Sequence, residues 1–179
     1  MIIENTFIKD LILITPNVFT DDRGYFMESY NLKKLEKVIK TEFVQDNESL
    51  SQKNVLRGLH FQKPPNAQAK LIRVVQGSIL DVAVDLRKDS ETYGKHFTHI
   101  LSDKNKKQLY IPVGFAHGFL CLEKNTILNY KCSAYYDASN EDSILWNDSE
   151  LNIDWGIDNP ILAEKDQIAK NFTTFENPF

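Results

Sequence analysis

The chain alternates short apolar segments with turn-forming residues from one end to the other. Prolines and glycines recur along it, and the stretches between them are rich in Val, Ile, Leu, Phe and Tyr. Many short strands separated by turns are typical of a β-sandwich or a small β-barrel. The segments expected to be strands are 11–14, 25–30, 54–62, 69–75, 79–86, 97–101, 107–111, 118–122 and 126–131.

Two segments are expected to be helical. Asn31 is a suitable N-cap for a helix over 31–40. Four apolar residues recur on one face of that helix: Leu32, Leu35, Val38 and Ile39. A shorter helix is expected over 163–169. No repeat, low-complexity tract or linker divides the sequence, so one domain over 1–179 is expected.

Composition and charge disfavour several classes of protein function. Of the 179 residues, 42% are hydrophobic and 26% are charged, and the formal net charge is -4. This charge disfavours broad binding to nucleic acid or to an anionic membrane. The sequence has neither a Gly-x-Gly-x-x-Gly pattern nor a Walker-type loop, which disfavours a Rossmann fold and a P-loop nucleotidase.

Cysteine usage and the N-terminal residues bear on the compartment. Cys121 and Cys132 form neither a metal-type pair nor a disulfide framework, which suits a reducing environment. The first residues carry charges and lack the apolar run of a signal peptide. No stretch approaches the ~20 apolar residues of a membrane span. A cytoplasmic protein is therefore expected.

His60 is the first candidate for chemistry. On a regular strand it shares a face with Leu56 and Gln62, opposite Arg57, so it points into the barrel if that face is the inner one. An imidazole there can act as a general base near neutral pH, because its reference pKa is about 6.5. A core histidine bonded to a backbone carbonyl is the structural alternative.

A second motif contains Pro112, Gly114 and His117 and resembles the second motif of the cupin superfamily, whose fold is a double-stranded β-helix of jelly-roll type. Pro and Gly suit a tight turn into a strand that carries the histidine. Metal-binding cupins have His-x-His in their first motif, whereas here Gln62 replaces the second histidine. Two histidines without a suitably spaced carboxylate make a metal site the weaker hypothesis.

The chain resembles the dTDP-4-dehydrorhamnose 3,5-epimerase family, the metal-free cupins of dTDP-L-rhamnose synthesis, almost end to end. The motifs that carry the resemblance are, in order, DRGYFME, QDN, LRGLHFQ, QAKL, DVAVDLR, GFAHGF, YK and EKD. The departures are small: Ala69 stands where Gly is frequent, and Ala163 where Ser is frequent. The resemblance implies an all-β cupin fold with one or two short helices and no cofactor. It also implies conversion of dTDP-4-dehydro-6-deoxy-D-glucose to dTDP-4-dehydro-L-rhamnose.

Inversion beside a ketone requires a base on one face of the sugar, an acid on the other, and a donor for the enolate oxygen. The resemblance implies that His60 is the base, Tyr130 the acid and Lys70 the oxygen's partner, with Asp166 completing a His–Asp pair. The residues alone leave Asp81 open as the partner of His60.

The resemblance also implies a set of substrate contacts: Arg23, Glu28, Gln45, Asp46, Asn47, Arg57, Lys70, His117, Glu141 and Lys165. Because Arg57 is predicted opposite His60, either Gly58 forms a bulge or the substrate wraps across a strand edge. The family is dimeric with exchanged N-terminal segments, so some residues from Arg23 to Asn47 are expected to reach the pocket of a partner subunit. The aromatic residue that stacks on thymine is not singled out by the sequence.

Three alternatives remain open. A relative with the same scaffold inverts C3 alone or moves the keto group of another nucleotide deoxysugar. A metal-dependent cupin oxygenase and a non-catalytic carbohydrate-binding or storage cupin are the alternatives from other classes.

Overall fold

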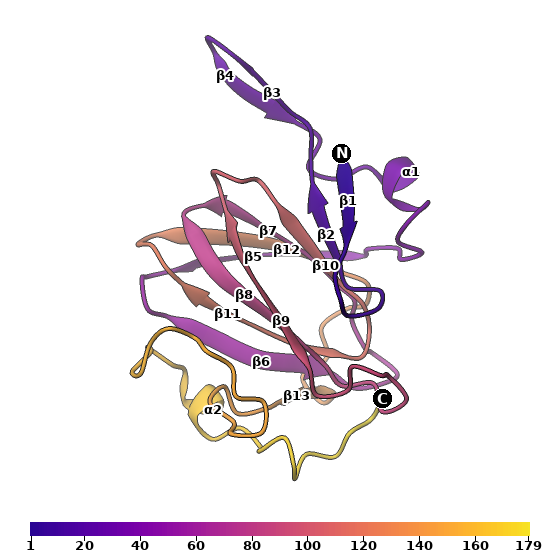
Figure 1. The fold of residues 1–179 in the computed structure, drawn as a ribbon, viewed down its shortest axis with the longest axis vertical. Coiled ribbons are helices and arrows are strands. Elements are labelled where there is room, and N and C mark those ends of the chain that lie inside the picture. Colours follow the sequence, from indigo (N-terminus) through magenta and orange to yellow (C-terminus); the bar gives the residue numbers. More distant parts are fainter.

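Strands dominate the computed structural model, which describes residues 1–179 (Figure 1). The strands are β1 (Ile2–Asn5), β2 (Ile12–Thr15), β3 (Val18–Asp21), β4 (Gly24–Met27), β5 (Gln45–Ser51), β6 (Leu56–Gln62), β7 (Lys70–Gln76), β8 (Ser78–Asp85), β9 (His96–Ser102), β10 (Gln108–Ile111), β11 (Phe115–Cys121), β12 (Thr126–Cys132) and β13 (Glu141–Ser143). The helices are α1 (Leu32–Leu35) and α2 (Glu164–Gln167). Neither helix is long enough to cross a membrane.

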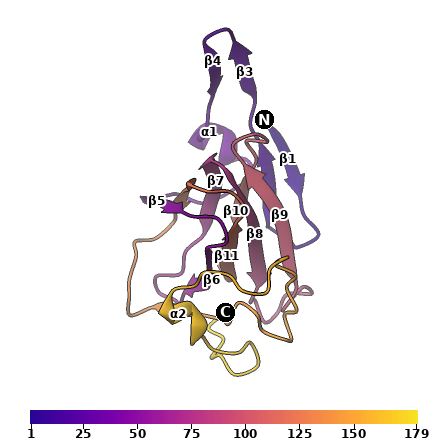
Figure 2. The same cartoon turned by 90° about the vertical axis from the view of Figure 1, so that its left-hand side faces the viewer.

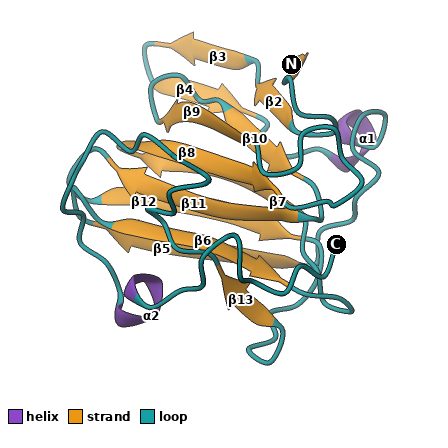
Figure 3. Cartoon of the chain, turned by 60° about the horizontal axis from the view of Figure 1, so that its bottom comes forward, coloured by secondary structure: helices purple, strands orange, loops and turns teal.

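The strands form two facing antiparallel sheets and one hairpin. The six-stranded sheet has the order β1-β2-β10-β7-β12-β5, and the five-stranded sheet has the order β13-β6-β11-β8-β9. Both helices lie outside the sheets (Figure 3). Strands distant in sequence pair as neighbours, as in a jelly roll. The predicted all-β cupin fold is therefore confirmed.

The main core lies between the two sheets. A cluster of 14 buried residues includes Ile72 and Val74 of β7 and Phe119 of β11. Leu71, the residue before Ile72, instead packs on the outer face of its sheet with Leu35. The alternation predicted for β7 is therefore confirmed, and it places Lys70 on the inner face.

The C-terminal segment covers the outer face of the five-stranded sheet. Leu151, Trp155 and Phe175 pack there against Val82 and Ala116. Figure 1 shows this segment and α2 running beneath β6. The packing attaches α2 to the sheet that carries His60.

Both helices are shorter than the sequence predicts. Asn31 caps α1 as expected and Leu35 is buried, but Leu32 and Val38 are exposed. Only part of the predicted apolar stripe is therefore buried. The α-helix itself covers four residues. Helix α2 likewise covers four residues of the expected 163–169, and its N-cap makes no side-chain hydrogen bond.

The strand predictions hold for most of the two sheets but miss four elements. The strand expected over 25–30 ends at Met27, and the one expected from 118 begins at Phe115. Strands β1, β3, β5 and β13 were not predicted. Strand β5 reads QDNESLS and has no apolar face that a hydrophobic pattern would reveal.

Candidate active site

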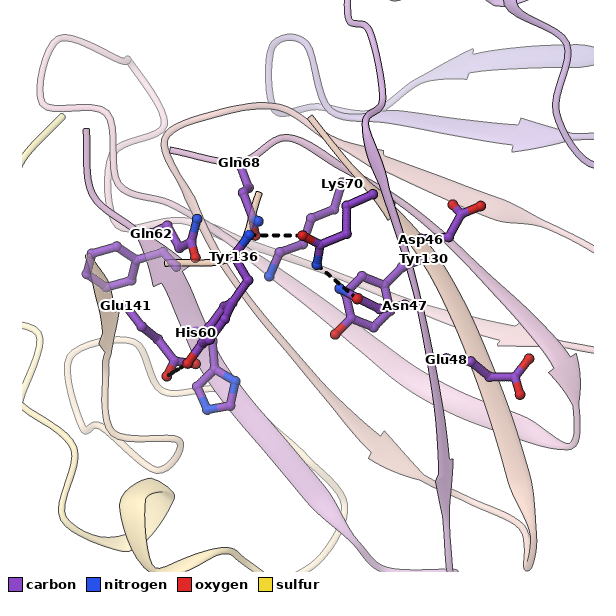
Figure 4. A pocket seen from close by; sticks show the side chains of 12 residues that line it. Asp46, Asn47, Glu48, His60, Gln62, Gln68, Lys70, Tyr130, Tyr136 and Glu141 are labelled. Carbon is purple, nitrogen blue, oxygen red and sulfur yellow. Dashed lines mark hydrogen bonds between the residues drawn. The ribbon is translucent and has the colours of Figure 1, made fainter. Parts of the chain in front are cut away.

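One pocket opens between the two sheets and has a volume of about 490 Å³ (Figure 4). Strand β6 contributes from the five-stranded sheet, and β5, β7 and β12 contribute from the six-stranded sheet. The lining residues are Gln45, Asp46, Asn47, Glu48, His60, Phe61, Gln62, Gln68, Lys70, Tyr130, Tyr136 and Glu141.

A bulge in β6 sets the direction of His60. The pairing with β11 runs from Arg57↔Phe119 to His60↔His117, so β6 has one residue more than its partner. Gly58 lies in this bulge with φ +125°, and a Cβ there would meet the Cα of Gly118 at 2.4 Å. Only glycine allows the two backbones to approach so closely in this conformation.

The bulge corrects the predicted alternation in β6. Leu56 packs in the outer cluster with Leu59 and Phe61, so it does not share a face with His60. Arg57, one residue after Leu56, therefore has the same orientation as His60, and its Nε donates to Ser51 of β5 at 3.1 Å. Of the two explanations for the Arg57 conflict, the structure shows the bulge.

His60 is paired with a buried carboxylate. Its Nε2 lies 2.5 Å from Oδ1 of Asp166 on α2. The side chain of His60 is 22% exposed, and that of Asp166 is 1% exposed. Asp166, and not Asp81, is thus the partner of His60. This contact leaves the other ring nitrogen free for a ligand.

Asp81 instead pairs with His117. Oδ1 of Asp81 is 2.6 Å from Nε2 of His117, both side chains are buried, and Oδ2 of Asp81 has no partner. Burial lowers the pKa of His117, which favours a neutral imidazole. His117 lies opposite His60 in the strand pairing and is not among the residues that line the pocket.

Lys70 and Tyr130 line the pocket from the opposite sheet. Tyr130 lies on β12, where it pairs with Ile72 of β7 on one side and with Asn47 of β5 on the other. Burial lowers the pKa of the Lys70 ammonium group, and burial raises the pKa of the Tyr130 phenol. The phenol therefore retains its proton at neutral pH, as a general acid must.

Glu141 and Lys165 form an ion pair at the pocket. Lys165 Nζ lies 2.9 Å from Glu141 Oε1, and the Tyr136 hydroxyl donates to Glu141 Oε2 at 3.1 Å. Burial is the largest single influence on the pKa of Glu141 and raises it. The hydrogen bond and the charge of Lys165, with smaller contributions from His60 and Tyr136, together outweigh burial and lower the pKa of the carboxyl. The pair places one cation and one anion beside His60.

Gln45 and Asn47 are half-buried on the inner side of β5 and hydrogen-bond to each other at 2.9 Å. Asp46, between them, points away from the pocket in Figure 4 and bonds to Lys131 at 2.9 Å. Asp46 is nevertheless among the residues that line the pocket.

Arg23 and Glu28 lie far from the pocket of their own chain. Arg23 is in the hairpin of β3 and β4, which projects from the end of the body (Figure 2). Its guanidinium bonds to Asp21 at 2.6 Å, and Glu28 bonds to Lys34. No contact of these two residues with the pocket arises within one chain.

The sequence did not single out Tyr136, Gln62 and Gln68 as pocket-forming side chains. Tyr136 is 55% exposed. The available signal was the pair Tyr135-Tyr136 in a polar segment, because exposed adjacent aromatics in such a segment are candidates for ligand contacts.

The arrangement provides acid–base chemistry on two sides of one ligand. His60 comes from one sheet and is paired with Asp166 of α2, and a protonated phenol and a lysine come from the other sheet. No group of three or more His, Cys, Asp and Glu side chains is arranged to hold a metal ion. The amide of Gln62 is engaged with backbone groups of Tyr135 and Asp137.

Comparison with known proteins places this geometry in a family. A family model described as dTDP-4-dehydrorhamnose 3,5-epimerase matches residues 5–174. The dTDP-4-dehydrorhamnose 3,5-epimerase of Salmonella typhimurium is 51% identical over 172 residues, 94% of each chain.

Solved structures agree with the sequence comparison. The 3,5-epimerase of Legionella pneumophila, in complex with dTDP-4-keto-L-rhamnose, superposes with a TM-score of 0.93 at 45% identity and covers 97% of this chain and 94% of its own. A 3'-monoepimerase from Streptomyces bikiniensis, in complex with dTDP-quinovose, superposes with a TM-score of 0.90 at 29% identity and covers 94% and 87%. The protein therefore belongs to the dTDP-4-dehydrorhamnose 3,5-epimerase family of cupin enzymes.

Proposed function

We propose that this epimerase inverts C3 and C5 of dTDP-4-dehydro-6-deoxy-D-glucose and forms dTDP-4-dehydro-L-rhamnose. The observation that carries the proposal is the placement of His60 and Tyr130 on opposite sheets across one pocket (Figure 4). Inversion needs proton removal from one face of the sugar and proton return to the other. A base and an acid that face each other meet this requirement.

In the proposed reaction, His60 takes the proton from C3, and the electrons of the C–H bond move into the C4 ketone to form an enolate. Asp166 stabilises the resulting imidazolium, because its carboxylate is bonded to the ring at 2.5 Å. Lys70 is the cation for the enolate oxygen. Tyr130 then delivers its phenolic proton to the opposite face of C3. Proton exchange with solvent returns a proton to Tyr130 and removes one from His60, and the same steps then follow at C5.

The nucleotide end of the ligand requires cations and an aromatic surface. The proposed partners of the diphosphate oxygens are Arg57, which bonds to Ser51 of β5, and Lys165, which bonds to the pocket residue Glu141. Tyr136 is the proposed stacking surface for the thymine base. It is the most exposed aromatic side chain lining the pocket, and Glu141 holds its hydroxyl.

A second copy of the chain is the proposed partner. The hairpin of β3 and β4 carries exposed Phe19, Tyr25 and Phe26, and Phe19 pairs directly with Phe26. An isolated two-stranded hairpin is marginally stable in water, and exposed aromatics favour burial in an interface. In the proposed homodimer, each hairpin brings Arg23 and Glu28 to the pocket of the other subunit.

We further propose that residues 1–179 form one catalytic domain that acts in the cytoplasm. The five-stranded sheet packs against the six-stranded sheet on one face and against the C-terminal segment on the other. Cys121 and Cys132 are both buried and unpaired, which suits a reducing compartment.

The proposed reaction is tested by incubation with dTDP-4-dehydro-6-deoxy-D-glucose in deuterium oxide, with a reductase that traps the product. NMR is expected to show deuterium at both C3 and C5 and the L-rhamno configuration. His60→Asn is expected to fold and to lose the label at both carbons.

Other results would favour other functions. Label at C3 alone, with the D-configuration retained at C5, would indicate a single-centre epimerase. Absence of label at both carbons, with or without added metal, would reject the epimerase proposal and leave the oxygenase and storage alternatives.

A further inference from the structure

The irregular segment 134–137 carries Tyr136 into the pocket. It follows β12 and has no regular secondary structure, and Tyr135 and Tyr136 are both exposed. Such a segment is expected to be mobile unless its backbone is held. A mobile backbone would leave the ring of Tyr136 without a fixed position.

Side-chain amides from outside the segment hold this backbone. Gln68 donates to the carbonyl of Ala134 at 2.7 Å, and Gln45 accepts from the amide of Tyr136 at 2.9 Å. Gln45 is therefore already engaged by the protein, although the family resemblance implied that it contacts substrate.

Gln62 makes the most extensive of these contacts. Its Nε2 donates to the carbonyl of Tyr135 at 3.2 Å and to that of Asn66 at 2.6 Å, and its Oε1 accepts from the amide of Asp137 at 2.8 Å. The bonds to Tyr135 and Asp137 lie on either side of Tyr136. Gln62 itself is 5% exposed, so water does not readily replace these bonds.

Only an amide side chain fits this position. Two donors and one acceptor at the end of a side chain of this length are found in glutamine, whereas a carboxylate has acceptors alone and an apolar side chain has neither. A histidine, which metal-binding cupins place here, could not make the three bonds.

We propose that Gln62 is a positioning residue that orients Tyr136 for the nucleotide, so that the strand position used by metal cupins for a ligand serves here to build the base-binding surface. This inference rests on the proposed function, because it takes Tyr136 as the surface for thymine. Gln62 hydrogen-bonds to the backbone on both sides of Tyr136, so its effect on the ligand is transmitted through the position of the Tyr136 ring.

The direct test is a double-mutant cycle between Gln62→Met and Tyr136→Ala, with the dissociation constant of dTDP measured by calorimetry. Gln62→Met keeps the length of the side chain and removes its three bonds. We expect it to weaken dTDP binding about three- to tenfold, a change typical of lost hydrogen bonds, and to leave kcat at saturating substrate nearly unchanged. In the Tyr136→Ala background, Gln62→Met should have no further effect.

A fluorine label reports on the orientation without any ligand. With 3-fluorotyrosine at position 136, Gln62→Met should broaden or split the fluorine NMR signal of the free protein. Gln76→Met is the matched control, because Gln76 also donates to a backbone carbonyl, that of Asn125, but does not line the pocket. It should leave the signal and the dTDP affinity unchanged. If Gln62→Met does not fold, Gln62→Glu replaces it, since it removes both donors at constant size.

The possible outcomes separate the two proposals. If the wild-type protein does not bind dTDP, the proposed function fails. If Tyr136→Ala weakens binding but the Gln62 variants do not, or if the two effects are additive, the positioning role of Gln62 is overturned and the proposed function stands. An unchanged fluorine signal in the Gln62 variants also overturns the positioning role.

Discussion

The pair of His60 and Asp166 joins two side chains that are 106 residues apart in sequence. A half-buried imidazole is thus oriented by a fully buried carboxylate. The carboxylate selects which ring nitrogen carries a proton and stabilises the imidazolium that forms during catalysis. The role proposed for Asp166 is therefore orientation and charge, while His60 performs the proton transfer.

Substitution of Asp166→Asn should separate these effects from folding. We expect kcat to fall about 10²–10⁴-fold, the range of general acid–base contributions, because the amide cannot stabilise the imidazolium. The affinity for dTDP, measured by calorimetry, should change little. Glu164→Gln on the same helix is the control and should keep wild-type activity, since Glu164 is exposed and outside the pocket. A kcat above a tenth of the wild-type value in Asp166→Asn would contradict the role.

The pH dependence of kcat should report on Lys70. Burial lowers its pKa below the ordinary 10.5, whereas burial raises the pKa of Tyr130 above the ordinary 10.0. As pH rises, Lys70 therefore loses its proton at a lower pH than a solvent-exposed lysine, and activity should fall on the alkaline side. In Lys70→Arg the guanidinium stays protonated. The residual kcat of this variant should therefore stay constant to higher pH than the wild-type kcat does, as measured in a stopped-flow or coupled assay. If kcat of Lys70→Arg falls at the same alkaline pH as in the wild type, the fall belongs to another group.

Both β6 and β7 were predicted as strands, but the face that points into the pocket was predictable only for β7. The alternation of Lys70, Ile72 and Val74 is local, so the sequence reveals which face is buried. The bulge in β6 depends on the approach of Gly118 from β11, a contact between strands that no local pattern encodes. The predicted direction of Leu56 was wrong for that reason.

Strand β5 and helix α1 show two further limits of local patterns. The inner face of β5 is polar because it lines a pocket, so the hydrophobic alternation that marks a strand is missing. The apolar stripe of α1 predicted ten residues of helix, but only part of the stripe finds a partner in the core. Local patterns could likewise not assign the partners of His60 and His117, because both depend on tertiary packing. The family resemblance, by contrast, implied the pair of His60 and Asp166 that the structure contains.

The bulge in β6 can be tested by Gly58→Ala. The new Cβ would lie 2.4 Å from the Cα of Gly118 and 2.7 Å from the carbonyl oxygen of His117, at a backbone φ of +125°. Strain and overpacking together should lower the free energy of unfolding by about 2–5 kcal/mol in urea denaturation.

Gly156→Ala is the control for conformational strain alone. Gly156 also has positive φ, but no heavy atom lies within 4 Å of the added Cβ. Its cost should be about 1 kcal/mol. Equal losses in the two variants would show that the contact between β6 and β11 does not constrain Gly58.

At the scale of the whole molecule, the hairpin of β3 and β4 stands out because it forms a separate two-stranded sheet that pairs with neither main sheet. Figures 1 and 2 show it extending away from the sheets that form the pocket. Its tip carries Arg23, one of four arginines in the chain, and its surface is aromatic. A proposed second subunit would use both the cation and the aromatic surface.

Co-expression of Arg23→Ala and His60→Asn chains tests whether the hairpin acts in the partner's pocket. Each variant alone should have low activity. In a mixed dimer, the pocket with intact His60 receives Arg23 from the other subunit, so one of its two pockets is complete. If subunits assort at random, about a quarter of wild-type activity should return. Activity no higher than that of Arg23→Ala alone would contradict exchange of the hairpins.

The most direct test of the two-sided proton transfer compares exchange with inversion in Tyr130→Phe. This variant lacks the proposed acid but keeps His60 and its bond to Asp166. In deuterium oxide, the solvent label should still enter the substrate at a rate within about tenfold of wild type, while net inversion falls about 10²-fold or more. NMR of the unconverted sugar and of the trapped product measures both rates in one sample. Equal losses of exchange and inversion would contradict the assignment of His60 and Tyr130 to opposite faces of the sugar.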